Sequence, residues 1–340
     1  MRIGRRYYKG SLYRGWTSAI IRLCTLAMAN IEPAPPLSAS PTQRPLLGIL
    51  LRLAAMAVLG VMFSLVKLAG QHGVHVTESL FYRQLAGLPV AIIWLWWTGA
   101  LASIRTARPM QHAVRMLLGV SAMALNFSAM LLLPMAEATT LGFAAQIFAT
   151  MLAAFLLREP TGRYRWGAVA LGFAGVVIAL QPGGQPLPLT GAMVALGGAL
   201  MTGCVIIQLR RMAQTEPAGA IVFWFSLTSL VPLGVAVAIF GKNHDLTSWS
   251  IIAGLSLAGA IAQILLTASL RHASVAAIMT MDYSALLWSA MIGFAVFGDM
   301  PGHSVWLGAP LIVGAGLIIA WREQFLARRR AMEAAEYPAG

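Results

Sequence analysis

Charged residues are scarce in this sequence: Asp, Glu, Lys and Arg together make up 10% of its 340 residues. A typical soluble domain is about 25% charged and about 45–50% apolar, whereas apolar residues reach 59% here. So few charges cannot give a protein of this size a water-compatible surface. The composition excludes a cytosolic globular enzyme and predicts an all-α polytopic membrane protein embedded in the lipid bilayer.

The sequence also lacks the motifs of common enzymes and pumps. Its two cysteines, Cys24 and Cys204, form no CxxC pair, which excludes a disulfide scaffold and a zinc ribbon. It contains no GxxxxGKS/T, HExxH or GxSxG motif, so we expect no catalytic site, no metal and no cofactor. Without an ATP-binding loop, transport would be secondary and driven by a gradient of the substrate or of a coupling proton or ion.

Ten stretches are long and apolar enough to be transmembrane helices, since a bilayer core needs about 20 apolar residues of helix. Pro, Gly or charged residues separate them, and several connecting loops are only a few residues long. Consecutive helices are therefore expected to be antiparallel neighbours. The predicted spans are 46–69, 79–101, 113–133, 136–157, 165–181, 189–211, 217–240, 249–270, 274–298 and 304–321.

The basic residues lie on one side of the predicted membrane. With the N-terminus inside, 20 of the 24 Lys and Arg residues fall in the terminal segments and the loops predicted inside. Only Lys242 falls in the loops predicted outside, and Arg52, Lys67 and Arg83 fall within spans. This asymmetry predicts a protein of the cell inner membrane with both termini cytoplasmic. It also explains the net charge of +13 through insertion and anionic lipid, so no nucleic-acid partner is expected.

The first 45 residues differ in composition from the rest, being basic at the start and then rich in Pro and Ser. We expect this leader to be disordered, and two interpretations stay open: a real basic extension, or translation that starts at Met28. The remaining chain divides into a first repeat of five spans at 46–181, a second at 189–321 and a basic cytoplasmic tail at 322–340.

The two five-span halves share a sequence pattern. An acid beside a proline, followed by Gly-Ala at the start of the next span, occurs at Glu159–Pro160 and again at Asp299–Pro301. Because each half has an odd number of spans, the second half would be inverted in the membrane relative to the first.

Together with Arg83, Asp282–Trp288 and Phe297–Pro301, these residues resemble the EamA-type module of the drug/metabolite transporter superfamily. The resemblance covers about residues 46–321 and extends to the branch that holds S-adenosylmethionine and riboflavin uptake carriers. It implies a secondary transporter of a small metabolite that works by alternating access between two inverted repeats. Family members commonly have Pro in the middle of spans 4 and 9, where this chain has Gln146-Ile147 and Asp282-Tyr283, so the cavity shape cannot be taken from the family.

Ionisable side chains inside the spans are candidates for the substrate cavity, because each is costly to place in lipid. Asp282 is interpreted as a charge partner for the substrate or a proton acceptor, with a polar contact to another helix as the alternative. Arg83 and Lys67 either line the cavity or extend toward the headgroups, and Arg83 has an interface pair with Glu78 as a further alternative. Arg52 is interpreted as a headgroup anchor.

Amides in mid-span and deeper aromatic residues complete the candidate set. The amides offer hydrogen bonds to a substrate or, alternatively, to other helices, and Asn126 and Gln263 hold near-matching positions in the two halves. Aromatic rings could stack on a planar ligand. Glycines such as Gly172 and Gly175 favour close helix contacts, within the chain or in a homodimer. The full set of cavity candidates is Asp282, Tyr283, Trp288, Asn126, Gln263, Gln146, Arg83, Lys67 and Gln208.

The function predicted from the sequence is secondary transport of a small-molecule substrate. Two alternatives stay open. One is an efflux carrier for amino acids or drugs with the same fold, and the other is a membrane scaffold or receptor that transports nothing.

Overall fold

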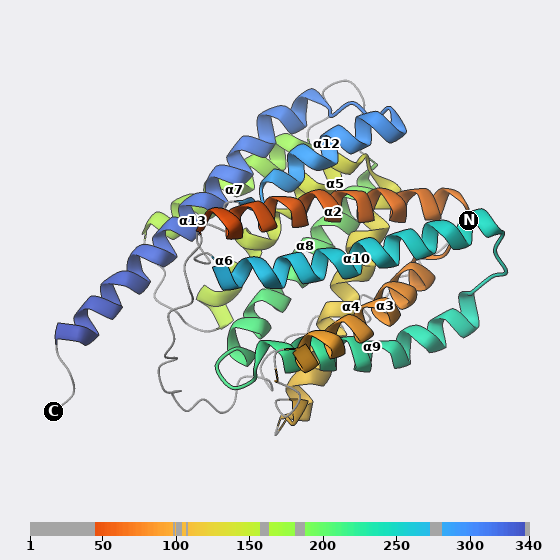
Figure 1. The fold of residues 1–340 in the computed structure, drawn as a ribbon. Coiled ribbons are helices and arrows are strands. Elements are labelled where there is room, and N and C mark those ends of the chain that lie inside the picture. Colours follow the sequence, from red (N-terminus) through yellow and green to blue (C-terminus); the bar gives the residue numbers. More distant parts are fainter. Residues whose placement is uncertain are drawn as a thin grey trace, which may run out of the picture.

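The computed structural model describes residues 45–97, 99, 104–106, 108–156, 163–180, 188–272 and 281–336. The predicted leader, Glu159 and the start of the predicted ninth span lie outside these residues. Within the described ranges every regular element is helical and no strand occurs (Figure 1). The helices are α2 (Pro45–Gln71), α3 (Val76–Trp97), α4 (Pro109–Leu132), α5 (Met135–Gly142), α6 (Ala144–Leu156), α7 (Arg163–Leu180), α8 (Leu189–Met212), α9 (Ala218–Phe240), α10 (Leu246–His272), α12 (Ser284–Phe297) and α13 (His303–Glu336).

Each predicted span overlaps one helix, except that the fourth corresponds to α5 and α6 together. Seven of the described segments are long and apolar enough to cross a bilayer. The segments Trp166–Leu180 and Ser284–Phe297 are apolar but shorter, and α3 carries Arg83 and Gln84, which lower its hydropathy. The structure supports a helical membrane fold, while the count of ten spans and the cytoplasmic termini stay predictions.

The last helix is longer than the sequence predicted. α13 continues to Glu336, beyond residue 321 where the predicted span ends, and it projects from the bundle as the blue helix in Figure 1. The basic tail is therefore largely helical. Its Ala, Arg and Glu residues are strong helix formers, which explains why the helix does not stop at the predicted end of the span.

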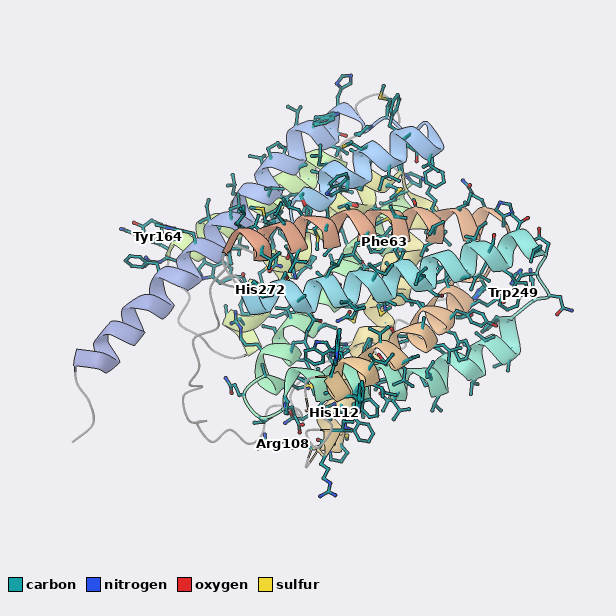
Figure 2. The ribbon with its side chains drawn as sticks, viewed as in Figure 1. Phe63, Arg108, His112, Tyr164, Trp249 and His272 are labelled. Carbon is teal, nitrogen blue, oxygen red and sulfur yellow. The ribbon has the colours of Figure 1, made fainter. Side chains whose placement is uncertain are left out.

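Helices from the two halves of the chain pack against each other in pairs. α2 runs alongside α10 through the middle of the bundle, α4 packs against α8, α3 against α9 and α7 against α13 (Figure 1). One buried core joins α2, α3 and α4 to α9 and α10. In it the ring of Phe63, which lies in the middle of the bundle (Figure 2), meets the ring of Phe127 edge to face at 5.9 Å. A second core joins α4, α5, α6 and α7 to α8 and α13. Each core therefore contains helices from both halves.

Two ion pairs fasten α2 to the ends of α12. Arg52 Nε and Nη2 donate to Asp282 Oδ1 and Oδ2 at 2.5 and 2.7 Å, just before α12 begins. Lys67 Nζ donates to Asp299 Oδ2 at 2.6 Å, just after α12 ends. Because about 22 Å of helix separates Arg52 from Lys67, one pair lies toward each end of the bundle. The interpretation of Arg52 as a headgroup anchor is wrong, since its guanidinium binds a carboxylate of another helix.

The fourth predicted span is broken at Phe143, between α5 and α6. The N–H of Phe143 reaches the carbonyl oxygens of both Thr139 and Thr140 at 3.2 Å, which tightens the helix locally. In the other half, Asp282 and Tyr283 form a turn before α12. The rings of Phe143 and Tyr283 lie 5.1 Å apart, so the break in the fourth span lies against the turn before α12. Both are made without proline.

Hydrogen bonds fix both ends of the loop that connects α9 to α10. Glu78, which is buried, accepts hydrogen bonds from the Lys242 N–H at 3.2 Å and from His244 Nε2 at 2.9 Å. Asp245 caps α10, because its Oδ1 accepts from the N–H and the hydroxyl of Ser248. These hydrogen bonds lower the pKa of Asp245 to about 2, so it stays charged beside the helix N-terminus. Trp249, in the first turn of α10, lies at this end of the bundle (Figure 2).

Glycines let α7 and α13 cross in close contact. A methyl group at Gly308 would lie 2.6 Å from the carbonyl oxygen of Gly175 and 2.8 Å from the backbone nitrogen of Ala179. A methyl group at Gly172 would lie 2.9 Å from the Cβ of Ala315. Gly172 and Gly175 therefore serve a contact inside the chain.

We expect Asp282→Asn to lower the thermal unfolding midpoint of the purified protein, because Arg52 is only 14% exposed and would lose its counter-charge. The expected loss is about 1–3 kcal/mol, less than for a fully buried pair because Asp282 is 31% exposed. The double variant Arg52→Gln/Asp282→Asn should recover most of it. A double variant no more stable than the single one would show that the two charges are not coupled.

We expect Gly308→Ala to destabilise the protein by about 1–3 kcal/mol, since the added methyl group meets backbone atoms of α7 that cannot rotate away. Gly314→Ala is the matched control on the same helix, because no other atom lies within 4 Å of the added methyl group. Thermal unfolding in detergent measures both. Equal midpoints for the two variants would contradict the close crossing of α7 and α13.

Candidate functional site

A polar cavity lies inside the bundle, between helices of both halves of the chain. Its volume is about 370 Å³, and its walls come from α3, α4, α8, α9 and α10. Polar side chains from all five helices face it, although the surrounding bundle is strongly apolar. They are Arg83, Gln84, Arg115, Asn126, Thr202, Ser226 and Gln263. We call this space the central cavity.

One face of α4 supplies much of the wall. Arg115, Gly119, Met123 and Asn126 follow one another at intervals of four, four and three residues and all line the central cavity. This spacing keeps them on a single side of the helix, with about 16 Å between the first and the last along the axis. The cavity therefore extends along nearly half of α4.

Two arginines dominate the electrostatics of the central cavity. Arg83 Nη1 donates to Gln84 Oε1 at 2.8 Å and lies 3.7 Å from the sulfur of Met123. The Arg115 guanidinium stacks on the Phe225 ring, with its carbon 4.1 Å from the ring centre. Among the described residues, none supplies a hydrogen-bond acceptor for Arg83 Nε or for Arg115 Nε and Nη1, although these atoms are buried.

The structure brings three of the candidates from the sequence into this cavity: Arg83, Asn126 and Gln263. Asn126 Nδ2 also donates to Thr202 Oγ1 at 3.1 Å, which joins α4 to α8 across the wall. Arg83 forms no pair with Glu78, whose carboxylate instead binds the backbone N–H of His75 at 2.8 Å and the loop before α10.

Three other candidates lie in a separate, smaller cavity of about 80 Å³: Gln146, Asp282 and Tyr283. Asp282 is held there by Arg52, and the hydroxyl of Tyr283 lies against Gly316 of α13, where a methyl group would overlap it. The structure therefore places Asp282 in the helix-to-helix contact that was the alternative to a substrate-binding role.

The remaining candidates lie outside both cavities. Lys67 binds Asp299, donates to the Leu133 carbonyl oxygen at 3.3 Å and lies over the Phe297 ring at 4.9 Å. Gln208 is buried and donates to the Gln111 carbonyl oxygen at 3.4 Å.

Trp288 packs on α2, where a methyl group at Gly60 would meet its Cβ at 3.3 Å. A further groove of about 330 Å³ between α12 and α13 is almost entirely apolar and displays exposed Leu287 and Trp306. Such a surface suits lipid chains.

Arg115 is the cavity-lining arginine that reasoning from the sequence missed. Arg115 lies at the third position of the predicted span 113–133, yet it was counted with the cations of the preceding cytoplasmic loop. α4 begins at Pro109, four residues earlier, so Arg115 lies in its second turn. Arg108 precedes the helix, and His112 lies in its first turn at the same end of the bundle (Figure 2). The helical spacing to Gly119 and Asn126 was the signal that could have identified Arg115.

Comparison with known proteins identifies relatives that match most of the chain. The Vibrio cholerae riboflavin transporter is 25% identical over 84% of this chain and 97% of its own length. The Rickettsia bellii S-adenosylmethionine uptake transporter is 25% identical over 74% of this chain and 85% of its own length. The Pseudomonas aeruginosa pseudopaline exporter is 23% identical over 80% of this chain and 95% of its own length.

A solved crystal structure shares the fold at 20% sequence identity, with a TM-score of 0.55 over 84% of this chain and 97% of that chain. The model of the EamA-like transporter family matches residues 46–181 and, separately, residues 189–321. Together these segments make up most of the sequence. This multi-pass membrane protein belongs to the EamA-like transporter family.

Proposed function

We propose that the chain is a secondary carrier that moves a small metabolite across the inner membrane by alternating access, with the substrate bound in the central cavity. The observation that carries the proposal is the cavity itself. It lies between helices of both halves and gathers polar groups where the bundle is otherwise apolar. Carriers bind their substrates near the middle of the membrane, between their repeats.

The packing of the helices supports two inverted repeats, 46–181 and 189–321. Exchanging the repeats maps α2 onto α8, α3 onto α9, α4 onto α10 and α7 onto α13. Under this exchange the α2–α10 pair becomes the α8–α4 pair, while α3–α9 and α7–α13 map onto themselves. These four are the most extensive helix contacts in the described bundle, as expected for two related halves that rock against each other.

The two broken spans support the same mechanism. Phe143 and Tyr283 mark the breaks in corresponding spans of the two repeats, and their rings are in contact. Discontinuous helices at a repeat interface are a recurrent element of carriers, in which the ends of the half-helices bind the substrate and the coupling ion. The excess of Lys and Arg in alternate loops supports cytoplasmic termini. A homodimer also stays a prediction, and the contacts of Gly172 and Gly175 with α13 remove one reason for it.

Relatives named for uptake and for export both match this chain, so the proposal includes either direction. Riboflavin and S-adenosylmethionine are the first substrates to test, followed by amino acids and nucleosides. A ligand at 100 times its dissociation constant stabilises the folded state by about 2.7 kcal/mol, which thermal unfolding detects. Protein-dependent flux of the ligand into vesicles would support a carrier, and binding without flux would favour a receptor.

We expect Gly87→Leu to reduce transport at least about tenfold while leaving the protein folded. Gly87 lines the central cavity, and the nearest atom to a new Cβ there is 3.9 Å away, so a leucine can occupy substrate space without a backbone clash. Gly167→Leu is the matched control, because Gly167 is an exposed helical glycine of α7 with no other atom within 4 Å. Both are measured as flux in reconstituted vesicles. Full transport by Gly87→Leu would place the substrate elsewhere.

The coupling proton is assigned to Glu137 in preference to Asp282. Glu137 is buried, and its Oε1 accepts a hydrogen bond from the Gly302 N–H at 3.1 Å. No described residue supplies a partner for its Oε2. Asp282, by contrast, has both oxygens bound to Arg52, so protonation there would break an ion pair.

We expect Glu137→Gln to abolish substrate accumulation driven by a pH gradient while leaving substrate exchange between the two sides of the vesicle. The amide keeps the shape of the side chain and removes the exchangeable proton. Flux with and without an imposed pH gradient is the measurement. Gradient-driven accumulation that survives in Glu137→Gln would exclude this residue as the proton carrier.

A further inference from the structure

We propose that the central cavity binds the anionic group of its substrate, a carboxylate or a phosphate, through Arg115 and Arg83. The inference rests on the proposed function and specifies the chemical class of the substrate. It differs from the interpretation of the sequence alone, in which Asp282 would select a cationic ligand.

Arg115 is arranged to receive an anion. One face of its guanidinium is covered by Phe225, and its Nε and Nη1 are buried without an acceptor among the described residues. Gly119, one turn further along α4, leaves the space that the guanidinium occupies, since a methyl group there would overlap Nη1. A buried donor without an acceptor is unfavourable, and a charged one more so. A bound carboxylate or phosphate would remove this penalty through charge-assisted hydrogen bonds.

Arg83 enters the same cavity from α3. Its Nη1 has a neutral acceptor in Gln84, and its Nε is buried without one. Gln84 is itself held by Ser229, to which its Nε2 donates at 2.9 Å. Arg83 is therefore oriented by neutral groups, and its charge is left for a ligand.

None of the six carboxylates in the described ranges between residues 45 and 322 pairs with either arginine. Each has another partner: Glu78 binds His244, Glu137 binds Gly302, Glu216 binds Thr106 at 2.6 Å, Asp245 binds Ser248, Asp282 binds Arg52 and Asp299 binds Lys67. The other intramembrane cations on α2 are thus matched within the protein, whereas the central cavity keeps two unmatched positive charges. This difference between α2 and the central cavity indicates that the substrate itself carries the negative charge.

The cavity can hold an anion together with a neutral remainder. Arg115 and Met123, which Arg83 contacts, are eight residues apart on α4, about 12 Å along the axis. Arg115 Nη1 lies beside Gly119, one turn nearer to Met123, which shortens this gap so that one small ligand can reach both guanidinium groups. Asn126, Thr202 and Gln263 line the same space and offer hydrogen bonds to uncharged parts of the ligand.

The first test needs no knowledge of the substrate. Met123→Glu places a carboxylate beside Arg83, whose Nη1 lies 3.7 Å from the Met123 sulfur, and Met123→Gln gives the same shape without charge. We expect Met123→Glu to unfold at a temperature several degrees above Met123→Gln and to transport poorly, because its own carboxylate takes the place of the ligand. A midpoint for Met123→Glu at or below that of Met123→Gln would overturn the proposal.

The second test compares matched ligands by thermal unfolding of the full-length protein. The pairs are nicotinamide and nicotinate, uridine and uridine 5′-phosphate, and riboflavin and riboflavin 5′-phosphate. In at least one pair we expect the anion to bind at least tenfold more tightly, a preference that Arg115→Gln removes and Arg115→Lys partly restores. Equal binding within every pair, or equal weakening of both members by Arg115→Gln, would overturn the proposal.

Two further outcomes are distinguishable. Stabilisation by phosphatidylglycerol vesicles but by none of the soluble anions would assign the arginines to a lipid headgroup and overturn the substrate assignment. Transport of a neutral or cationic compound that Gly87→Leu blocks would keep the proposed function and reject an anionic substrate.

Discussion

A charged side chain inside a bilayer has no bulk water to solvate it, so another part of the protein or a ligand must supply the opposite charge. α2 meets this requirement twice, with Arg52 bound to Asp282 and Lys67 bound to Asp299. These pairs determine how α12 lies along α2, since its two ends are tied to fixed points on one rigid helix. The same requirement applies to the central cavity, because Arg83 and Arg115 have buried N–H groups for which no described residue supplies an acceptor.

Much of this architecture could be predicted from the sequence, because hydropathy and charge asymmetry act locally. Each predicted span overlaps a helix, and Arg83, Asn126 and Gln263 were selected for their polarity and share one cavity. The pairing of Arg52 with Asp282 could not be predicted in the same way. The two residues are 230 positions apart, and only the packing of α2 along α12 brings them together. Arg115 was missed for a smaller reason: it lies two residues inside the predicted start of the third span and was counted as a loop cation that sets the topology.

The breaks at Phe143 and Tyr283 show a second limit of local reasoning. The family commonly has proline in these two spans. Because this chain has no proline there, its sequence was equally compatible with an unbroken helix. Gly142, a weak helix former, directly precedes the break at Phe143, and the Thr139 hydroxyl bonds back to the Met135 carbonyl oxygen at 2.8 Å. Such local preferences weaken a helix without ending it. The contact between the two aromatic rings is tertiary, and it stabilises both breaks at once.

Two arginines without a counter-charge also provide a way for a carrier to avoid changing conformation when no substrate is bound. Closing the bundle around two unneutralised charges removes their remaining hydration, which disfavours the occluded state. A bound anion supplies the missing charge and lowers that penalty, so it stabilises the closed conformation more than the open ones. A ligand shifts a conformational equilibrium only through such a difference in affinity between states. On the proposal of an anionic substrate, the arginines of the central cavity both select the substrate and make its presence a condition for the movement of the two repeats.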